Sequence, residues 1–483
     1  MKTLTTCIIL ALCLCAWIEA APAKAADAPA QGNQAEGTPV VADKLYQETY
    51  RPQFHFTPAK NWTNDPNGCV FYKGEYHLFF QHNPTGINWG NMTWGHAVSP
   101  DMVRWKQLEH AIHPDKLGTI FSGSAVVDSG NTAGFQTGDE KVIVCIYTSA
   151  GKPFTQSIAY SNDRGRTFTK YEKNPVLGHI VGSNRDPKVL WHEPTKKWVM
   201  ALFLKNNYAL FASPDLKAWE RLCDVPVPGA GECPDFFELP IDGNPKNTRW
   251  VFWGANNTYL LGTFDGKTFE KESGPHPSNW GGNCYAAQTW SDIPPSDGRR
   301  LQIAWMRGGK YPGMPFNQQM SFPTELTLRT TPEGVRLTKK PVREIENIRA
   351  KKHSWAARAL APGGENLLSG LEGELFDIRA EIELGQATEV GFTLRGQKVR
   401  YDAAAKEVTA LGKKAPLAPI DSRIRLQILL DRTSIEVFGN DGLISMPTCF
   451  LPDLANRTLA VYAEGGEARI VSLEVYELRS AWE

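Results

Sequence analysis

The chain has 483 residues, of which 42% are hydrophobic, so it can bury a sizeable core and does not have the composition of a disordered protein. Its 52 basic and 52 acidic residues cancel and no basic run occurs, which argues against a nucleic-acid partner. The length allows two or three domains, or one large barrel or propeller followed by a smaller domain.

The N-terminal stretch has the pattern of a secretory signal peptide over residues 1–25. Lys2 precedes an apolar run at 8–18 that is too short to span a bilayer comfortably, and small residues follow at 20–25. An uncleaved anchor is the alternative. We expect a secreted or periplasmic protein that has no membrane contact after cleavage, and a flexible lead-in, rich in Ala, Pro, Gly and Gln, over residues 26–46. The six cysteines beyond the signal are scattered with no C-x-x-C pair, so we predict no metal site.

Residues 47–340 contain short runs of β-branched and aromatic residues separated by turn residues. A repeat runs through them, because tight turns at Asp101, Asp163, Asp215 and Asp265 each follow an apolar strand and precede an aromatic residue. These aspartates recur at intervals of roughly 50–60 residues, which is typical of propeller blades. The sequence therefore predicts an all-β fold with a five-bladed β-propeller, and coincidental turns in a β-sandwich are the alternative.

The pattern changes after the propeller. Charged, turn-like residues at 341–365 indicate a linker or a short helix. From 366 to 483 apolar and polar residues alternate with period two, and 439–442 reads Gly-Asn-Asp-Gly, a strong hairpin turn. We predict a C-terminal β-sandwich domain over 366–483.

Three acidic residues on turns are candidates for chemistry. Asp65 and Asp186 each precede a proline, and Glu232 follows a glycine and has the apolar Cys233 beside it. Inner strands of all blades border the central channel, so acids from different blades can meet at one mouth. A pair of carboxyl groups flanking the scissile bond is what glycoside hydrolysis requires. Each acid alone could equally be a structural turn or half of an ion pair.

Several motifs in order resemble glycoside hydrolase family 32, the family of invertases, inulinases and levanases. The motifs lie at 62–68 (Trp-Thr-Asn-Asp-Pro-Asn-Gly), 79–84, 89–97, 121–125, 185–187 (Arg-Asp-Pro), 232–233 (Glu-Cys), 303–306 and 430–442. The resemblance implies a propeller followed by a sandwich and a retaining mechanism, with no cofactor. Asp65 would be the nucleophile, Glu232 the acid and base, and Asp186 the stabiliser of the transition state. It also implies substrate contacts from Trp62, Asn64, Gln81, Trp89, Phe121, Ser122, Arg185, Tyr285 and Trp305.

We therefore expect a secreted exo-acting enzyme that releases fructose from the ends of levan, inulin or sucrose-type sugars, with a weak preference for fructans. The alternatives are an endo-acting or disaccharide-releasing fructanase, an inverting five-bladed glycosidase, and a non-catalytic sugar-binding propeller. An inverting enzyme would hold its two carboxyl groups further apart, at about 6.5–9.5 Å rather than about 5–5.5 Å. Nothing in the sequence points to a particular oligomeric state.

Overall fold

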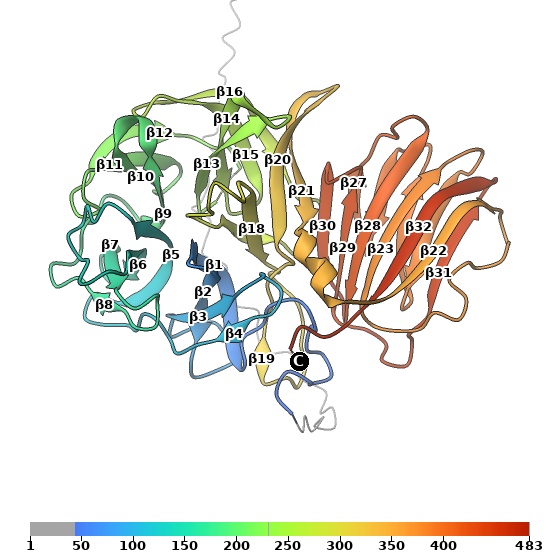
Figure 1. Ribbon diagram of the computed structural model, residues 1–483, viewed down its shortest axis with the longest axis horizontal. Helices are drawn as coiled ribbons and strands as arrows, with labels where there is room; N and C mark the ends of the chain where they lie inside the picture. The colour runs from blue at the N-terminus through green and yellow to red at the C-terminus, as the bar shows by residue number, and fades with distance from the viewer. Residues whose placement is uncertain (1–43, 230, 483) are drawn as a thin grey trace, which may run out of the picture. The chain divides into compact units, whose positions relative to one another are not determined.

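The computed structural model describes residues 44–229 and 231–482 (Figure 1). In these residues the fold is almost entirely β, with thirty-two strands and two short 3-10 helices, η1 (Glu193–Thr195) and η2 (Arg343–Ile348). The all-β prediction is confirmed. The predicted signal peptide and most of the predicted lead-in lie outside the described residues. No helix in the described ranges is long and apolar enough to cross a membrane.

Five successive antiparallel blades form the predicted propeller, each with its first strand innermost. The first two blades are β1 (Asn61–Tyr72), β2 (Glu75–Asn83), β3 (Thr93–Ser99), β4 (Lys106–Gln107), and β5 (Thr119–Asp128), β6 (Val142–Ala150), β7 (Thr155–Ser161), β8 (Thr169–Lys170). The next two are β9 (Arg185–His192), β10 (Lys197–Phe203), β11 (Tyr208–Ser213), β12 (Glu220–Val225), and β13 (Asp235–Ile241), β14 (Asn244–Gly254), β15 (Thr258–Phe264), β16 (Phe269–Pro277). The fifth is β17 (Tyr285–Thr289), β18 (Arg300–Trp305), β20 (Thr324–Thr331) and β21 (Gly334–Pro341), while β19 (Phe316–Asn317) pairs in parallel with β1.

The repeated aspartates have one structural role in four blades. Each lies between the third and fourth strands, and its Oδ1 accepts backbone N–H groups two and three residues ahead, or three and four in the case of Asp163. An Asp side chain that bonds to the backbone ahead of it closes a tight turn. The period seen in the sequence is therefore the period of one turn per blade.

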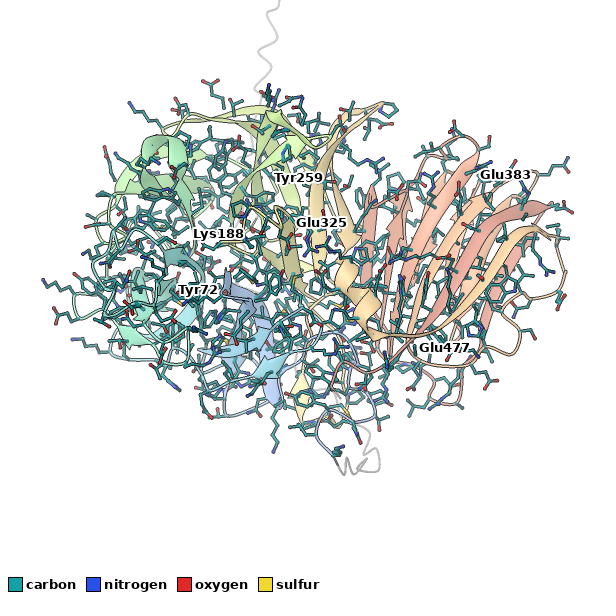
Figure 2. The ribbon with its side chains drawn as sticks, in the orientation of Figure 1. Tyr72, Lys188, Tyr259, Glu325, Glu383 and Glu477 are labelled. Carbon is teal, nitrogen blue, oxygen red and sulfur yellow. The ribbon has the colours of Figure 1, made fainter. Side chains whose placement is uncertain are left out.

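Blade packing explains why the middle strands read as continuous apolar runs. Strands β6 and β10 are buried along almost their whole length, because neighbouring blades cover both faces of each sheet. One hydrophobic cluster, which includes Val144, Ile158, Met200 and Phe211, joins the second blade to the third. Lys188 of β9 lies in the middle of the ring of blades (Figure 2).

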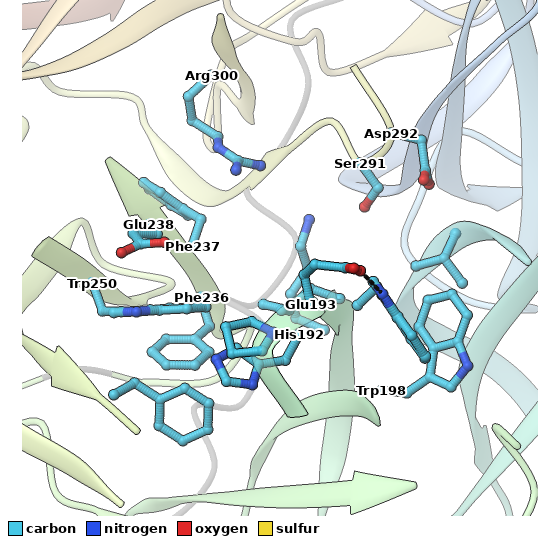
Figure 3. Close-up of a pocket in the computed structure, with 16 residues that line it drawn as sticks. His192, Glu193, Trp198, Phe236, Phe237, Glu238, Trp250, Ser291, Asp292 and Arg300 are labelled. Atoms are coloured by element: carbon cyan, nitrogen blue, oxygen red, sulfur yellow. Dashed lines mark hydrogen bonds between the residues drawn. The ribbon is translucent and has the colours of Figure 1, made fainter. Parts of the chain in front are cut away.

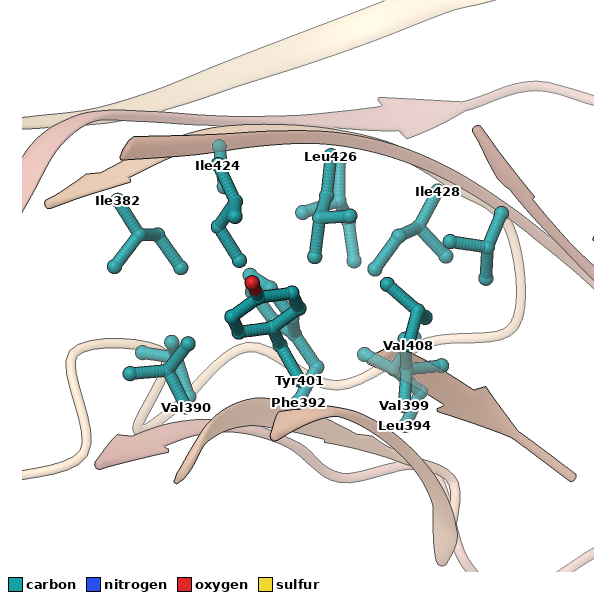
Figure 4. Close-up of a cluster of buried hydrophobic side chains, with 14 of the residues drawn as sticks. Ile382, Val390, Phe392, Leu394, Val399, Tyr401, Val408, Ile424, Leu426 and Ile428 are labelled. Carbon is teal, nitrogen blue, oxygen red and sulfur yellow. The ribbon is translucent and has the colours of Figure 1, made fainter. Parts of the chain in front are cut away.

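Residues 349–478 form a β-sandwich of two antiparallel sheets, as predicted. One sheet has the order β22 (Arg349–Leu360), β32 (Ala468–Leu478), β23 (Phe376–Glu383), β28 (Arg423–Asp431), β29 (Ser434–Gly439), β30 (Ile444–Cys449). The other has the order β27 (Lys413–Pro416), β26 (Glu407–Ala410), β25 (Gln397–Asp402), β24 (Glu389–Leu394), β31 (Leu459–Glu464). Between the sheets Ile382, Ile424 and Ile428 face Val390 and Phe392 (Figure 4). The alternation seen in the sequence is this buried face.

The expected linker at 341–365 is partly wrong. Residues 343–348 form η2, but 349–360 form β22, which pairs along its length with β32. Most side chains of β22 are exposed, because it is the edge strand of its sheet. Apart from Leu360 and Trp355, which pack on the core, the strand is defined by backbone pairing, so the hydrophobic pattern carries little signal of it.

A buried charge cluster joins the segment before β1 to the sandwich. The His55 ring lies between two carboxylates, with Nδ1 2.8 Å from Asp431 Oδ2 and Nε2 2.7 Å from Glu436 Oε1, and all three side chains are buried. Burial alone would lower the pKa of His55, but the hydrogen bonds to Asp431 and Glu436 outweigh it and raise the pKa to about 9.

This cluster predicts a loss of stability in mild alkali. The contribution of His55 is fully present below its unfolded pKa of about 6.5 and is lost as the pH rises through about 9, a change of roughly 3 kcal/mol. We expect the free energy of unfolding to fall over this range in the wild type and to fall less in His55→Gln. Urea unfolding at several pH values measures this, with His353→Gln as the control. Parallel pH curves for the wild type and His55→Gln would contradict the assignment.

Candidate active site

The starts of the inner strands bring the three predicted acids together at one end of the propeller. Asp65 lies on β1, Asp186 is the second residue of β9, and Glu232 lies three residues before β13. The backbone is irregular at each place. The β1–β2 register shifts between Thr63 and Pro66, and φ is 65° at Asp186 and 47° at Cys233. Bulges and left-handed residues of this kind re-aim side chains out of a regular strand and are common at active sites.

Asp65 is held by donors from its own strand and from β5. Ser122 Oγ donates to Asp65 Oδ2 at 2.6 Å, and the Asn64 amide donates to Oδ1 at 3.1 Å. Trp62 Nε1 in turn donates to Asn64 Oδ1 at 2.8 Å. These contacts fix one orientation of the carboxylate, which preorganises it for attack on a substrate.

Cys233 links Asp65 to Asp186. Its Sγ lies 3.5 Å from Asp65 Oδ2 and 3.4 Å from Asp186 Oδ2, and its backbone N–H donates to Asp186 Oδ2 at 3.1 Å. Two carboxylates from the first and third blades therefore approach one sulfur atom, and Glu232 is its chain neighbour. The three acids therefore lie together at one end of the propeller, as expected from the sequence.

Glu232 is held by a cation on one oxygen and a phenol on the other. Arg185 Nε and Nη2 donate to Glu232 Oε2 at 2.9 and 2.5 Å, and the Tyr285 hydroxyl donates to Oε1 at 2.9 Å. Arg185 Nε is also 3.6 Å from Asp186 Oδ2. Such charge-assisted bonds fix the position of the carboxyl group more firmly than neutral ones.

Burial and mutual repulsion shift the titration of the site. Burial raises the pKa of Asp65 and the charge of Glu232 raises it further, whereas hydrogen bonds from Ser122 and Asn64 lower it. Burial also raises the pKa of Asp186; Arg185 opposes this shift, and the charges of Glu232 and Asp65 add to it. Asp65 and Asp186 therefore hold a proton more readily than exposed aspartates do.

The predicted aromatic residues form the walls. The Trp305 ring lies 6.1 Å from Trp62 and 6.2 Å from Tyr285, both nearly edge to face. Trp89 pairs instead with Phe121 at 6.0 Å and is 59% exposed, which places it at the rim and not beside the acids. Gln81 is buried and reaches the site through Asn67, whose Oδ1 accepts from Gln81 Nε2 at 3.1 Å when its amide is oriented to suit its neighbours.

Polar residues tie the inner strands together below the acids. Gln288 of β17 accepts the N–H of Cys69 at 3.0 Å and donates to the carbonyl of Gly123 at 2.9 Å, which joins the fifth blade to the first and second. Lys188 Nζ donates to Thr289 O at 2.6 Å and lies 3.5 Å from Asp235 Oδ1. These residues form a closed floor, and the small space above it holds about 10 Å³.

Three residues of the site were not predicted from the sequence. Cys233 bridges two acids, Asn67 supports Ser122 and Gln81, and the Arg307 guanidinium lies over Tyr285 at 4.8 Å and Trp305 at 5.7 Å. Cys233 and Asn67 stand inside quoted motifs, which was the available signal. Within residues 44–229 and 231–482 no group of three His, Cys, Asp or Glu side chains is arranged to hold a metal ion.

A propeller that gathers three acids at one mouth, joined to a sandwich, defines a glycoside hydrolase. The model for the glycosyl hydrolases family 32 N-terminal domain matches residues 55–341, and the model for the family 32 C-terminal region matches 344–477. The chain belongs to glycosyl hydrolases family 32 and is a glycosidase.

Curated relatives cover most of the chain. A levanase of Bacillus subtilis (strain 168) is 43% identical over an alignment of 484 positions, which covers 90% of this chain and 72% of the levanase. An extracellular exo-inulinase of Aspergillus awamori is 31% identical over an alignment of 522 positions, which covers 90% of this chain and 96% of the inulinase. Invertase 1 of Saccharomyces cerevisiae is 36% identical over an alignment of 341 positions, which covers 65% of this chain and 63% of the invertase.

Solved structures share the whole two-part fold. The crystal structure of the exo-inulinase from Aspergillus awamori superposes with a TM-score of 0.83 at 28% identity, covering 90% of this chain and all of that chain. A fructofuranosidase from Schwanniomyces occidentalis complexed with fructose superposes with a TM-score of 0.79 at 28% identity, covering 91% of this chain and all of that chain. The predicted five-bladed propeller followed by a C-terminal β-sandwich is confirmed.

Proposed function

We propose that this enzyme is an exo-acting, retaining β-fructofuranosidase that releases fructose from the non-reducing ends of fructans or from sucrose. The observation that carries the proposal is the approach of Asp65 and Asp186 to the thiol of Cys233, directly beside Glu232. The family relationship adds support, because relatives of this chain include a levanase, an exo-inulinase and an invertase.

The reaction proceeds in two displacements. Asp65 attacks the anomeric carbon of the terminal fructose while Glu232 gives its proton to the leaving oxygen, which breaks the glycosidic bond and forms a fructosyl ester on Asp65. Glu232, now a carboxylate, takes a proton from water. That water attacks the same carbon, and Asp65 leaves as a carboxylate.

The neighbouring groups suit these roles. We assign Asp186 to the fructose hydroxyls, where its charge stabilises the positive sugar ring of the transition state. Arg185 and Tyr285 hold Glu232 in place through both of its oxygens. We assign Trp62, Asn64, Gln81, Ser122 and Trp305 to the pocket, and Trp89 with Phe121 to its rim.

Fructose release from sucrose, inulin and levan tests this function. Free fructose as the product at early times from each hydrolysed substrate is the expected result. Early oligosaccharides or difructosides would favour an endo-acting or disaccharide-releasing fructanase. No fructose from any of the three sugars would overturn the proposal.

Removing the Ser122 hydroxyl shifts the acid limb of activity. Ser122→Ala removes a donor that lowers the pKa of Asp65, so the pKa rises and the nucleophile protonates at higher pH. We expect kcat/KM to fall about tenfold or more and its acid limb to move to higher pH. A full pH–rate profile measures both, and Ser157→Ala, which changes a buried serine elsewhere, is the control. A lower rate with an unmoved acid limb would show a packing role only.

We further propose that the mature protein is exported, and that residues 47–340 form the catalytic domain which the sandwich supports. The apolar N-terminal run and the extracellular exo-inulinase relative support export. The intact mass of the secreted enzyme tests it, since cleavage removes the first 20–25 residues, and retention of the complete N-terminus would contradict it.

A further inference from the structure

A second basin opens at the opposite end of the inner strands from the acids. It has a volume of about 400 Å³, within the range of about 300–1,000 Å³ typical of ligand pockets. Residues from the later parts of β5 and β9, from the first half of β13 and from the segment after β17 line it. The floor of Gln288, Lys188 and Asp235 stands between this basin and the catalytic acids.

Aromatic and polar side chains both line the basin. Figure 3 shows the largely buried Trp250, Phe236 and Trp198 on one side, with His192, Glu193 and Glu238 among them. Arg300, Ser291 and Asp292 lie across from them. An apolar surface that faces hydrogen-bonding groups is how proteins bind a sugar ring, whose faces are apolar and whose edge carries hydroxyls.

The polar groups retain free bonding capacity. Among the residues that the structure describes, the Arg300 guanidinium has no carboxylate within 4.0 Å and stacks over Phe237 at 5.2 Å instead. Asp292 is exposed within the basin and uses Oδ2 to accept the N–H of Val127 at 2.8 Å, which leaves Oδ1 open. A ligand that accepts from Arg300 and donates to Asp292 would satisfy both groups.

The charges select a neutral ligand. An anion would face Asp292 and Glu238, and a cation would face Arg300 and Lys188. A purely apolar ligand would cover these groups without satisfying them, which costs free energy. We propose that the basin is a second, non-catalytic site that binds a neutral oligosaccharide segment. That this saccharide is fructan rests on the proposed function, whereas the neutral polyhydroxyl class rests on the lining alone.

Calorimetric titration of the Asp65→Asn enzyme with a short inulin oligosaccharide tests the site without turnover. We expect two binding sites per chain in Asp65→Asn and one in Asp65→Asn with Arg300→Ala, because the second variant loses the basin donor. Trp191 also lines the basin and is partly exposed. Asp292→Asn and Trp191→Ala, each in the same background, should each weaken the second site about tenfold or more. Arg221→Ala, an exposed arginine outside the basin, should leave both sites unchanged.

A single site in Asp65→Asn that survives Arg300→Ala would overturn the proposal, as would binding of inorganic phosphate in the basin without sugar binding. Circular dichroism melting identifies variants that have not folded. Any one of the three wall variants that does fold is enough to test whether the basin binds sugar. Turnover separates the two proposals. If the wild type hydrolyses none of the fructosides the proposed function fails, yet the titration with inulin, and a parallel one with a glucan oligosaccharide, still decides whether the basin binds sugar.

Discussion

Asp65→Asn abolishes fructose release, with kcat lower by about 10⁴-fold or more, because an amide cannot form and release the ester that the first displacement needs. The fold should be retained, since the amide oxygen of the substituted side chain can still accept the hydrogen bond that Ser122 now gives to Asp65. Initial rates on sucrose and the melting temperature measure the two effects.

Asp163→Asn is the matched control, since this aspartate closes a blade turn and does not contact the three acids. It should leave kcat within a factor of about two. A wild-type rate for Asp65→Asn would remove the nucleophile assignment. The first anomer formed gives an independent test by NMR: β-fructose indicates retention, and α-fructose would indicate an inverting enzyme.

Glu232→Gln should lower the rate on sucrose by about 10²–10⁴-fold, because glutamine cannot protonate the leaving oxygen. A substrate with a good leaving group, such as fructosyl fluoride, needs no such proton. Its first displacement should therefore stay fast, and the fructosyl ester on Asp65 should accumulate because the base for water is also missing. Mass spectrometry of the quenched protein detects the added fructosyl group.

Glu220→Gln, on the exposed strand β12, is the control and should be neutral. Equal losses on sucrose and on fructosyl fluoride would argue against the acid role of Glu232. Absence of the ester in Glu232→Gln, together with detectable ester in wild-type enzyme quenched during turnover, would argue against its role as the base.

The propeller could be predicted from local sequence because four of its five blades repeat the same Asp turn. The turn at Asp101 recurs at three later aspartates, and the bonds that close each turn lie within four residues of the aspartate. The sandwich was predictable for the same reason, since one buried face imposes alternation along β23 and β28. Strand β22 was not predictable, because its side chains are mostly exposed and its partner β32 lies far along the chain.

The three acids could be chosen from their turns and motifs, but their mutual contacts could not be read from the sequence. Cys233 lies 168 positions from Asp65, and its thiol reaches that carboxylate only because the blades close into a ring. Asn67 and Arg307 act through contacts of the same non-local kind. Trp89 shows that a motif does not fix the exact position of a residue in the site. It belongs to a strong motif, yet it lies at the exposed rim with Phe121.

The closed floor beneath the acids has a consequence for how a polymer is degraded. Gln288 and Lys188 tie the inner strands together under the carboxylates, which leaves little room beneath the acids, in the part of the chain that the structure describes, for sugar units to thread through. Under the proposed function, a fructan would therefore enter by its tip. After each cut the monosaccharide would have to leave before the new tip could dock, so shortening would proceed one unit at a time.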